Sequence, residues 1–570
     1  MKKRIVVSLL SIAMIAALTV GCGGTAKEGE VLKKEKVVKQ ETKQEETKGI
    51  SDTIVVGVAD NVPGVFNPVI ASKSTDQDIA GMLYASLLEM NDKGEFQPYL
   101  AESYEVSDLK MSFKLRENAK WHDGTPITAE DVAFTLDCIM NPDFTGTCYS
   151  NYATITGAEA RHNGTADHVE GVKVIDDYNI EINFDKTYAP LFSDFVTRGI
   201  IPKHIWEKVP VGEFDAAVDL MKQSVGSGPY KMEEYVEGQH VNLVANEDFF
   251  LGEPKTKHLV MKILSVESII AEYKNGTIDI AGVKDVKTDE LETIKSEFGM
   301  EVKSFPSHGY QYIGINMRKD VFKDKALREA LIYALDRDQI VDKILEGRAT
   351  TLEAPFLPSG WAKADENITV NRKYDLEKAK SLLKDAGYKD SDENGILENK
   401  DGIELSFTYK VPSNQPISQE VALIVQQAWK EIGVHIDIKS MEFMTVWEES
   451  VKNHDFDFYT MGCQFGEDPD IEMWWHSSAS TDEVGVYSFN FDAFKNPEAD
   501  ELIIKANETN DQDTRKEYYN KVASIISEEA PMIFLYVQDN MYAYPKGTEG
   551  FSPYTFNIFY NVYNWTIPEK

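Results

Sequence analysis

MSFKLRENAKWHDGTPITAEDVAFTL, Met111 to Leu136, contains the pattern that decides the fold class of this chain. Apolar and polar residues alternate from Met111 to Leu115, as in a strand with one buried face. Asp123-Gly124 is a typical turn pair. Thr128 followed by Asp131 resembles a capping box that opens a helix. The stretch therefore predicts a strand, a turn and a helix in succession.

The same alternation of strands and helices continues along the chain. Residues 53–60 form a β-rich run, and residues 74–88 have apolar positions at helical spacing. Residues 325–347 predict two helices, because Asp336 with Gln339 forms a second cap signal. Residues 417–443 predict a helix that ends at Gly433 and is followed by a strand. The chain is therefore expected to be an α/β protein.

Chain length predicts more than one lobe. About 520 residues follow the N-terminal segment, whereas single hydrophobic cores stop growing near 250 to 300 residues. No internal repeat of 20 to 50 residues is visible. No later linker is as polar as the segment at residues 23–50. We expect lobes that are joined by strands inside the fold, with ample room for a cleft.

The first residues predict a secretion signal. Basic residues 2–4 precede an apolar run, residues 5–20, that is too short to span a bilayer comfortably. Cys22 follows as in a lipobox, in which the cysteine becomes the diacylated first residue of a bacterial lipoprotein. Thr19 stands where leucine is usual. The alternative is an ordinary secretory signal with an incidental cysteine.

Residues 23–50 predict a solvated tether. They hold seven lysines and six glutamates and no aromatic residue. Such a composition buries too little apolar surface to offset the entropy lost on ordering. Two acyl chains on Cys22 suffice for stable anchoring. We expect a folded body that is secreted and held to the outer face of the cytoplasmic membrane through this lipid anchor alone.

Charge and motifs argue against several function classes. The formal net charge of −36 repels nucleic acid. The sequence has no nucleophile elbow, zinc-protease helix, P-loop or dinucleotide-binding glycine pattern. A secreted glycoside hydrolase needs two carboxylates across one bond, and no acidic pair stands out. Outside the signal, Cys138 and Cys148 could form a disulfide or remain buried thiols.

At this point the chain resembles the large extracellular solute-binding proteins of family 5, which deliver oligopeptides, dipeptides or nickel to ABC importers. The resemblance is greatest to the oligopeptide-binding members and covers roughly residues 52 to 570. Several long motifs in the family's order carry it: LAESYEVSDLKMSFKLRENAKWHDGTPITAEDVAFTL (100–136), GSGPYKMEEYVEGQHVNLVANEDFF (226–250), NGTIDIAG (275–282), YIGINMRKDVFKDKALREALIYALDRDQIV (312–341), NPEADELI (496–503) and APMIFLYV (530–537).

The resemblance implies a two-lobed α/β fold of the periplasmic-binding-protein type, in the large class that carries an extra domain. The ligand would lie in a cleft between lobes that close by hinge motion. By resemblance, the first lobe is discontinuous. The expected parts are lobe I at 51–98, 222–312 and 543–570, the extra domain at 99–221, and lobe II at 313–542.

The segment FGEDPDIEMWWHSS, residues 465–478, lies at the cleft wall in the family. Many dipeptide and oligopeptide binders carry an aspartate three residues before the Asp of Asp-Pro, where it pairs with the α-ammonium of the peptide. Phe465 stands at that position here. Glu467, Asp468 and Asp470 are near enough to substitute for it. The structural alternatives are a turn at Asp468 and a helix cap at Asp470.

The resemblance also suggests aromatic and amide contacts with the ligand. Phe443 falls where family members often carry an aromatic residue along the ligand's path, and Tyr312 and Trp361 are further candidates. Of the adjacent Trp474 and Trp475, which point about 100° apart on a helix, one is expected in the core. Asn414, in a loop, could bind a ligand backbone. The predicted ligand-binding set is Tyr312, Trp361, Asn414, Phe443, Phe465, Asp468, Asp470 and Trp475.

A second pattern, DSDENGILENKD at residues 390–401, fits the spacing of a calcium loop. Its ligands would be Asp390, Asp392, Asn394, the carbonyl of Ile396, Glu398 and Asp401. The last position lacks the usual bidentate glutamate, and a strand-like run follows. The alternative is a polar hairpin. No cofactor is required for transport, so any calcium here would be structural.

Three functions remain. We expect an oligopeptide-binding component of an ABC importer. It would capture peptides by hinge closure of its lobes and deliver them to the permease subunits, and it would not act as an enzyme. The missing aspartate favours long ligands with unfixed ends over dipeptides. The same fold could instead bind a nickel chelate, a sugar or a signalling peptide. A secreted hydrolase is the third alternative. A monomer is expected, with no nucleic acid partner.

Overall fold

The computed structural model describes residues 49–107 and 109–570, and Gly49–Lys570 form one compact unit. The predicted signal, Cys22 and the tether up to residue 48 lie outside the described residues. Within the described ranges, no helix is long and apolar enough to cross a membrane. The account below therefore concerns the unit from Gly49 onward.

A mixed sheet of 12 strands organises this unit. The sheet contains both parallel and antiparallel strand pairs. Strands alternate with helices along the chain, as the sequence predicted for an α/β protein. The order is β16 (His435–Met441), β15 (Ser406–Pro412), β17 (Phe458–Gln464), β13 (Gly309–Ile315), β18 (Met532–Pro545), β11 (Ile280–Gly282), β1 (Thr53–Val58), β10 (His258–Ile263), β9 (His240–Ala245) and β8 (Tyr230–Val236); β12 (Met300–Pro306) and β14 (Ala349–Thr351) also pair with β18.

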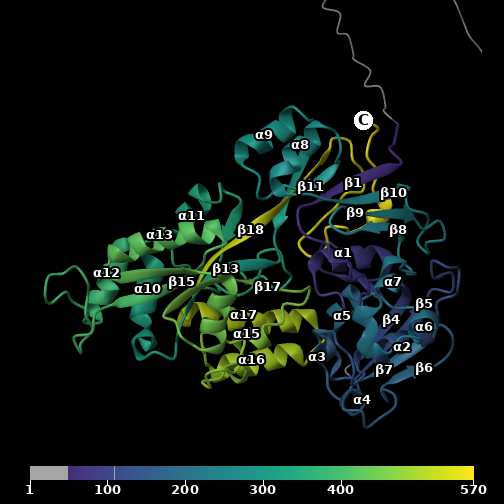
Figure 1. Ribbon diagram of the computed structural model, residues 1–570. Coiled ribbons are helices and arrows are strands. Elements are labelled where there is room, and N and C mark those ends of the chain that lie inside the picture. Colours follow the sequence, from purple (N-terminus) through teal and green to yellow (C-terminus); the bar gives the residue numbers. More distant parts are fainter. Residues whose placement is uncertain (1–48, 108) are drawn as a thin grey trace, which may run out of the picture. The chain divides into compact units, whose positions relative to one another are not determined.

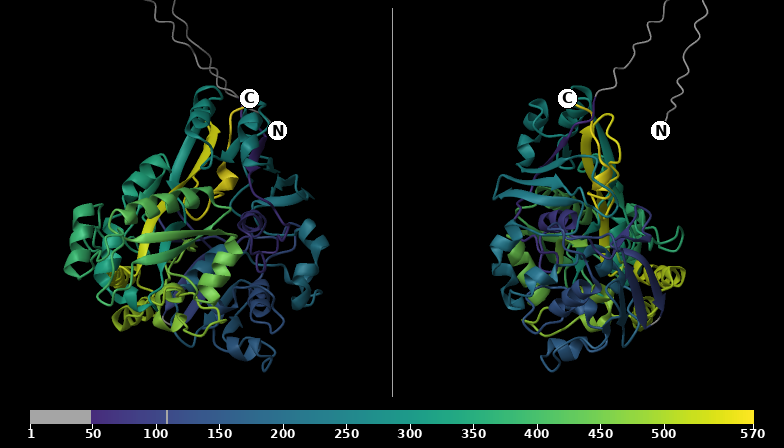
Figure 2. Two further views of the ribbon diagram at one scale, coloured as in Figure 1. Left: turned by 60° about the vertical axis from the view of Figure 1, so that its left-hand side comes forward. Right: turned by 90° about the vertical axis from the view of Figure 1, so that its right-hand side faces the viewer.

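The 14-residue strand β18 joins the two halves of this sheet. Its first part pairs with β13, with Phe534 opposite Tyr312. Its second part pairs with β12, with Asn540 opposite Phe305. Figures 1 and 2 show this long yellow strand between teal elements at one end and green elements at the other. The halves are thus connected through strands rather than through a polar linker.

The opening sequence stretch folds as predicted. β5 (Lys110–Leu115) is followed by a turn in which the N–H of Gly124, at φ +88°, donates to the Trp121 carbonyl at 2.8 Å. α2 (Ala129–Ile139) begins after Thr128, whose N–H donates to Asp131 Oδ2 at 2.9 Å. α2 contacts two strands of a separate four-stranded sheet, β4 (Ala101–Ser107), β5, β7 (Asn179–Asn183) and β6 (Val172–Val174).

Two of the predicted helical regions have the predicted ends. α10 (Lys325–Tyr333) and α11 (Arg337–Lys343) are separate helices, and the carboxylate of Asp336 accepts from the N–H of Gln339 at 2.9 Å. α13 (Pro416–Lys430) is followed by Gly433 at φ +77° and then by β16. Both predictions are confirmed, because each relied on a local capping or terminating signal.

One helix prediction was too long. α1 (Ser74–Leu83) begins at the predicted residue but ends five positions before Leu88. The carbonyl of Leu83 accepts hydrogen bonds from the N–H groups of Ser227 and Gly228, at 2.9 and 2.8 Å. Two N–H groups from a loop distant in sequence therefore occupy the Leu83 carbonyl that the next helical turn would have used. The chain then forms the short hairpin of β2 (Leu88–Met90) and β3 (Phe96–Pro98).

The remaining helices cover the sheets or connect their strands (Figure 1). They are α3 (Tyr149–Tyr152), α4 (Ala158–His162), α5 (Leu191–Thr197), α6 (Lys203–Trp206), α7 (Val218–Lys222), α8 (Ile269–Lys274), α9 (Thr288–Ser296), α12 (Leu376–Asp385), α14 (Phe443–Trp447), α15 (Glu472–Trp475), α16 (Pro497–Asn507) and α17 (Gln512–Glu529).

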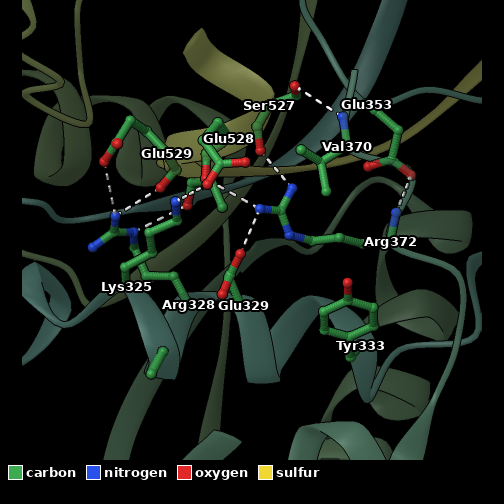
Figure 3. A network of polar contacts seen from close by, with 12 residues as sticks. Lys325, Arg328, Glu329, Tyr333, Glu353, Val370, Arg372, Ser527, Glu528 and Glu529 are labelled. Carbon is green, nitrogen blue, oxygen red and sulfur yellow. Dashed lines mark hydrogen bonds and ion pairs between the residues drawn. The ribbon is translucent and has the colours of Figure 1, made fainter. Parts of the chain in front are cut away.

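Two buried arginines bind the C-terminal end of α17 (Figure 3). The last carbonyls of a helix have no partners within the helix. Arg328 donates to the carbonyls of Glu529 and Ala530, at 2.7 and 3.1 Å. Arg372 donates to the carbonyl of Glu528 at 3.1 Å and forms an ion pair with Glu329 at 2.6 Å. The network ties α10, α17 and the segment at residue 372 together.

The two cysteines near α2 are separate buried thiols, so the disulfide alternative is not the one the structure adopts. The Sγ of Cys148 lies 3.8 Å from the carbonyl oxygen of Val69. Burial raises the pKa of Cys138 to about 12 and that of Cys148 to about 11. Both thiols are therefore protonated at neutral pH and unreactive.

Candidate ligand-binding site

A cavity of about 610 Å³ is bounded by residues far apart in the sequence. Its wall contains α1, part of α5, the segment 465–467 that follows β17, and the C-terminal segment 554–563. A neighbouring cavity of about 370 Å³ shares lining residues with it, including Asp78 and Tyr542. Volumes of 300 to 1,000 Å³ are usual for small-molecule and cofactor sites.

Three carboxyl groups line the larger cavity without an ion pair or a hydrogen bond to another described residue: Asp78, Glu89 and Glu467, of which Glu467 accepts only from its own backbone N–H. All three side chains are partly buried. Burial raises the pKa of each of them to about 7. Removing a carboxylate from water disfavours its charged form unless a cation or donor compensates it. A cationic group in the cavity would therefore stabilise the charged form of these carboxylates.

The other charges at this cavity are paired. Arg198 forms an ion pair with Asp194 at 3.0 Å, and its Nη1 also lies 3.5 Å from the carbonyl oxygen of Pro68. His308 lines the cavity, and burial lowers its pKa. The imidazole is thus neutral at physiological pH. The unpaired charge at the cavity wall is negative.

Aromatic rings form much of the remaining surface. The lining includes Tyr84, Tyr99, Phe465, Tyr542, Tyr554, Phe556, Phe559 and Tyr563. The hydroxyl of Tyr554 donates to the carbonyl of Met90 at 2.7 Å, which fixes the C-terminal segment against β2. Rings of this kind give apolar contact area with a polar edge. The site can hold apolar and polar portions of one ligand.

Phe465, a predicted ligand-binding residue, lies in the wall of the 610 Å³ cavity. Its N–H donates to the carbonyl of His308 at 2.8 Å, and its ring centre lies 5.6 Å from that of Tyr310. Phe465 also lines a small pocket with Trp361. The structure therefore brings these two predicted residues together. The next residues, Gly466 and Glu467, face the same large cavity.

Asp468 and Asp470 make structural contacts instead. Both oxygens of Asp468 accept from Arg515, at 2.7 and 2.8 Å. Asp470 Oδ1 accepts from the N–H of Glu472 at the start of α15, at 2.9 Å, and Oδ2 accepts from the hydroxyl of Tyr188 at 3.1 Å. Neither residue lines the 610 Å³ cavity. The contacts of Asp470 match the capping alternative.

The other predicted aromatic residues lie in packed surroundings. Tyr312 is 2% exposed and Trp475 is 3% exposed, and both line a pocket of only about 20 Å³. Trp475 is the tryptophan of the pair that lies in the core. Phe443 begins α14 and is partly buried beside Trp447, whereas Asn414 is exposed. None of these four residues lines the large cavity.

Residues 390–401 fold as a loop stabilised by its own backbone. The carboxylate of Asp390 accepts from the N–H groups of Asn394 and Gly395, at 3.1 and 2.9 Å. Asp392 also accepts from the N–H of Asn394, and Glu398 accepts from that of Ser391.

Isolated bridges join Lys389 to Glu398 and Glu398 to Glu404, as in a hairpin. The described residues contain no group of three His, Cys, Asp or Glu side chains placed to hold a metal. Asp401, a further predicted ligand, does not belong to such a group, and Ile396 would contribute only its backbone carbonyl. The hydrogen bonds and bridges are those of the hairpin alternative, and calcium binding by residues 390–401 stays a prediction.

Sequence reasoning did not identify Asp78, Glu89, Asp194 or Arg198 as site residues. These charged groups come from α1, β2, α5 and the residue that follows α5, and long stretches of chain separate these elements. No short motif marks them in a sequence with 95 acidic residues. Only the packing of these elements identifies them.

Comparison with known proteins places this chain beside one family model, one relative and two solved structures. A family model described as "Bacterial extracellular solute-binding proteins, family 5 Middle" matches residues 95–484, more than half of the chain. The oligopeptide-binding protein AppA of Bacillus subtilis is 28% identical over 572 residues, covering 99% of each chain.

Two solved structures are similar throughout. AppA from Bacillus subtilis in complex with a nonapeptide has a TM-score of 0.71 at 28% identity, covering 92% of this chain and 100% of that one. NikZ from Campylobacter jejuni in complex with Ni(L-His) has a TM-score of 0.72 at 26% identity, covering 91% and 100%.

Proposed function

Since this chain belongs to the bacterial extracellular solute-binding proteins of family 5, we propose that its ligand is an oligopeptide. The family is one of binding proteins, and the fold is the two-lobed α/β fold of its solved members. The peptide would bind between the lobes and be delivered to the permease subunits of an ABC importer. No catalytic turnover is part of this function.

The observation that carries the proposal is the cavity of about 610 Å³ with Phe465 in its wall. An aspartate at this position would fix a free amino terminus, whereas a phenylalanine does not. Aromatic lining with a few polar groups suits ligands of varied sequence. Similarity to AppA over nearly the whole of both chains supports an oligopeptide rather than a dipeptide.

A different solute is the second candidate. NikZ shares the fold at a comparable TM-score and was solved with Ni(L-His). In this chain, the described residues contain no group of three metal-ligating side chains, so a metal would have to arrive with its own chelator. A small chelate would occupy part of the cavity and leave the remainder to water.

The mode of attachment is also proposed here. Cys22 would carry two acyl chains, and residues 23–50 would tether the folded unit to the outer face of the cytoplasmic membrane. Ligand-induced closure of the lobes would create the surface that the importer recognises. The folded unit acts as a monomer in this proposal.

Native mass spectrometry of residues 49–570, purified without refolding, tests the ligand class. These residues form one compact unit. A ladder of bound masses that sequencing resolves into peptides is the expected result, and it reports peptide length directly. A single non-peptide mass or a metal chelate would replace the oligopeptide with the second candidate.

A further inference from the structure

The cavity has an excess of unpaired negative charge, which restricts the ligands it can bury. Among its lining residues, Asp194 is paired with Arg198, and His308 is neutral. Within the part of the chain that the structure describes, Asp78, Glu89 and Glu467 form no ion pair and no hydrogen bond to another residue, and Glu467 accepts only from its own backbone N–H. Besides burial, the positive charge of Arg116 acts on Glu89 and that of Arg198 acts on Glu467. Both cations already have partners, because Arg116 Nε donates to the carbonyl of Tyr99 at 2.6 Å and Arg198 is paired with Asp194.

Glu89 and Glu467 lie near the same tyrosine although they come from β2 and from the segment after β17. Burial raises the pKa of Tyr554, and next in order come the charges of Glu467, Tyr560 and Glu89. Both carboxyl groups are thus within electrostatic reach of the Tyr554 hydroxyl. That hydroxyl donates to the Met90 carbonyl at 2.7 Å, which fixes its position beside β2.

Asp78 lies at a second place. It lines both the 610 Å³ cavity and the 370 Å³ cavity, as does Tyr542. The charge of Asp78 raises the pKa of Tyr542, after the larger effect of burial. Each of the two places therefore combines at least one carboxyl group that has no ion pair with a nearby tyrosine.

We propose that this cavity selects peptides carrying ammonium or guanidinium groups, one bound by Glu89 and Glu467 beside Tyr554 and another by Asp78 where the two cavities meet. The inference rests on the proposed function and specifies its substrate class. A cation supplies the charge-assisted hydrogen bonds that these carboxylates lack, and the tyrosine faces add cation–π contact. A neutral ligand would leave the same carboxyls desolvated and unpaired.

Lysine or arginine side chains and a free α-amino group offer the same chemistry. Four peptides of equal length separate these sources, with the length taken from the co-purified ligands. One has a free amino terminus and no basic residue. The other three are acetylated and carry lysine, glutamine or glutamate at one central position. Calorimetry with residues 49–570 measures each affinity at pH 7.

We expect the acetylated lysine peptide to bind at least tenfold more tightly than its glutamine analogue, and the glutamate analogue to bind most weakly. The tenfold preference should fall to less than threefold in Glu467→Gln and in Glu89→Gln. Glu233→Gln, an exposed residue of β8 away from the cavity, is the matched control and should keep the preference. Binding of the lysine peptide should also release protons, because the carboxyls titrate near pH 7.

The outcomes separate this inference from the proposed function. A gain confined to the free amino terminus, lost in Glu467→Gln, would assign the cation to the peptide's end and retain the proposal. Equal binding of the lysine, glutamine and glutamate peptides would overturn it while leaving peptide binding intact. Failure of every peptide to bind would refute the oligopeptide function itself.

Discussion

Arg515 and Asp468 form a two-point ion pair at 2.7 and 2.8 Å, and each side chain is only 6% exposed. Asp468→Asn leaves the guanidinium buried without its counter-charge, so we expect it to lower the free energy of unfolding by about 3 to 5 kcal/mol. Urea unfolding measures the change. Glu501→Gln, which removes an exposed ion pair with Lys505, should cost less than about 1 kcal/mol. Similar losses in both variants would contradict this account.

Stability should depend on pH through Glu467. Its pKa is raised from 4.5 to about 7, first by burial, and the neighbouring charges are Asp194, Arg198 and Asp468. Between these two pKa values the folded state binds more protons than the unfolded state, so its stability falls as pH rises from 4.5 to 7. Above pH 7 the folded state bears the full cost of keeping the ionised Glu467 carboxylate buried.

Glu467→Gln removes that penalty. We therefore expect a higher melting temperature than that of the unmodified protein at pH 8 and little difference at pH 5, in the absence of ligand. Differential scanning calorimetry at the two pH values measures the effect, and Glu233→Gln is the control. An equal shift at both pH values would mean that the titration of Glu467 is not its cause.

Phe465→Asp should create a site for a free amino terminus. The new carboxylate would lie at the wall of the 610 Å³ cavity and could form a charge-assisted hydrogen bond with an α-ammonium. We expect short peptides with free amino termini to bind about tenfold more tightly than their acetylated forms. Calorimetry compares the two. Phe465→Leu, which keeps the wall apolar, should show no such preference; an absent preference in Phe465→Asp would refute the assignment.

Membrane attachment should depend on Cys22. Cys22→Ala removes the sulfur that would carry the diacylglycerol, so we expect the protein to leave the membrane fraction and enter the medium. Immunoblots of fractionated cells measure the distribution. Cys138→Ala, which leaves the signal unchanged, is the control. Continued sedimentation of Cys22→Ala with membranes would rule out lipid anchoring.

The effect of calcium on stability separates the predicted calcium loop at residues 390–401 from the hairpin alternative. The carboxylates of Asp390 and Asp392 accept backbone hydrogen bonds within their own loop, and the bridges around Glu398 are those of a hairpin. The hairpin alternative predicts equal melting temperatures with millimolar calcium and with a chelator. The calcium loop predicts a rise with calcium that Asp392→Ala abolishes.

Local signals predicted much of the fold. The capping interactions of Thr128 with Asp131 and of Asp336 with Gln339 involve residues three positions apart, and both helices begin where these pairs indicate. The end of α1 was not predictable in this way. It depends on Leu83 accepting from Ser227 and Gly228, which are distant in sequence.

The candidate site was less predictable than the fold. Phe465 was identified because a family motif surrounds it, and the motif carries positional information. Asp78 and Glu89 carry no such signal, since an acid on a helix or in a short strand is usually solvated. Asp468 was predicted from its proximity to Phe465. Its role depends on Arg515 of α17, a partner that the local sequence does not indicate.

The position of β18 has a consequence for the order of folding during synthesis. This strand lies between β13 and β11 in the middle of the sheet, yet it ends at Pro545, close to the C-terminus. Neither half of the sheet can complete its pairing until almost the entire chain has been made. A chain stopped short of Met532 would have unpaired edges at β13 and β11, open to association with other chains. Such a chain should therefore aggregate or be degraded rather than persist as a smaller folded protein.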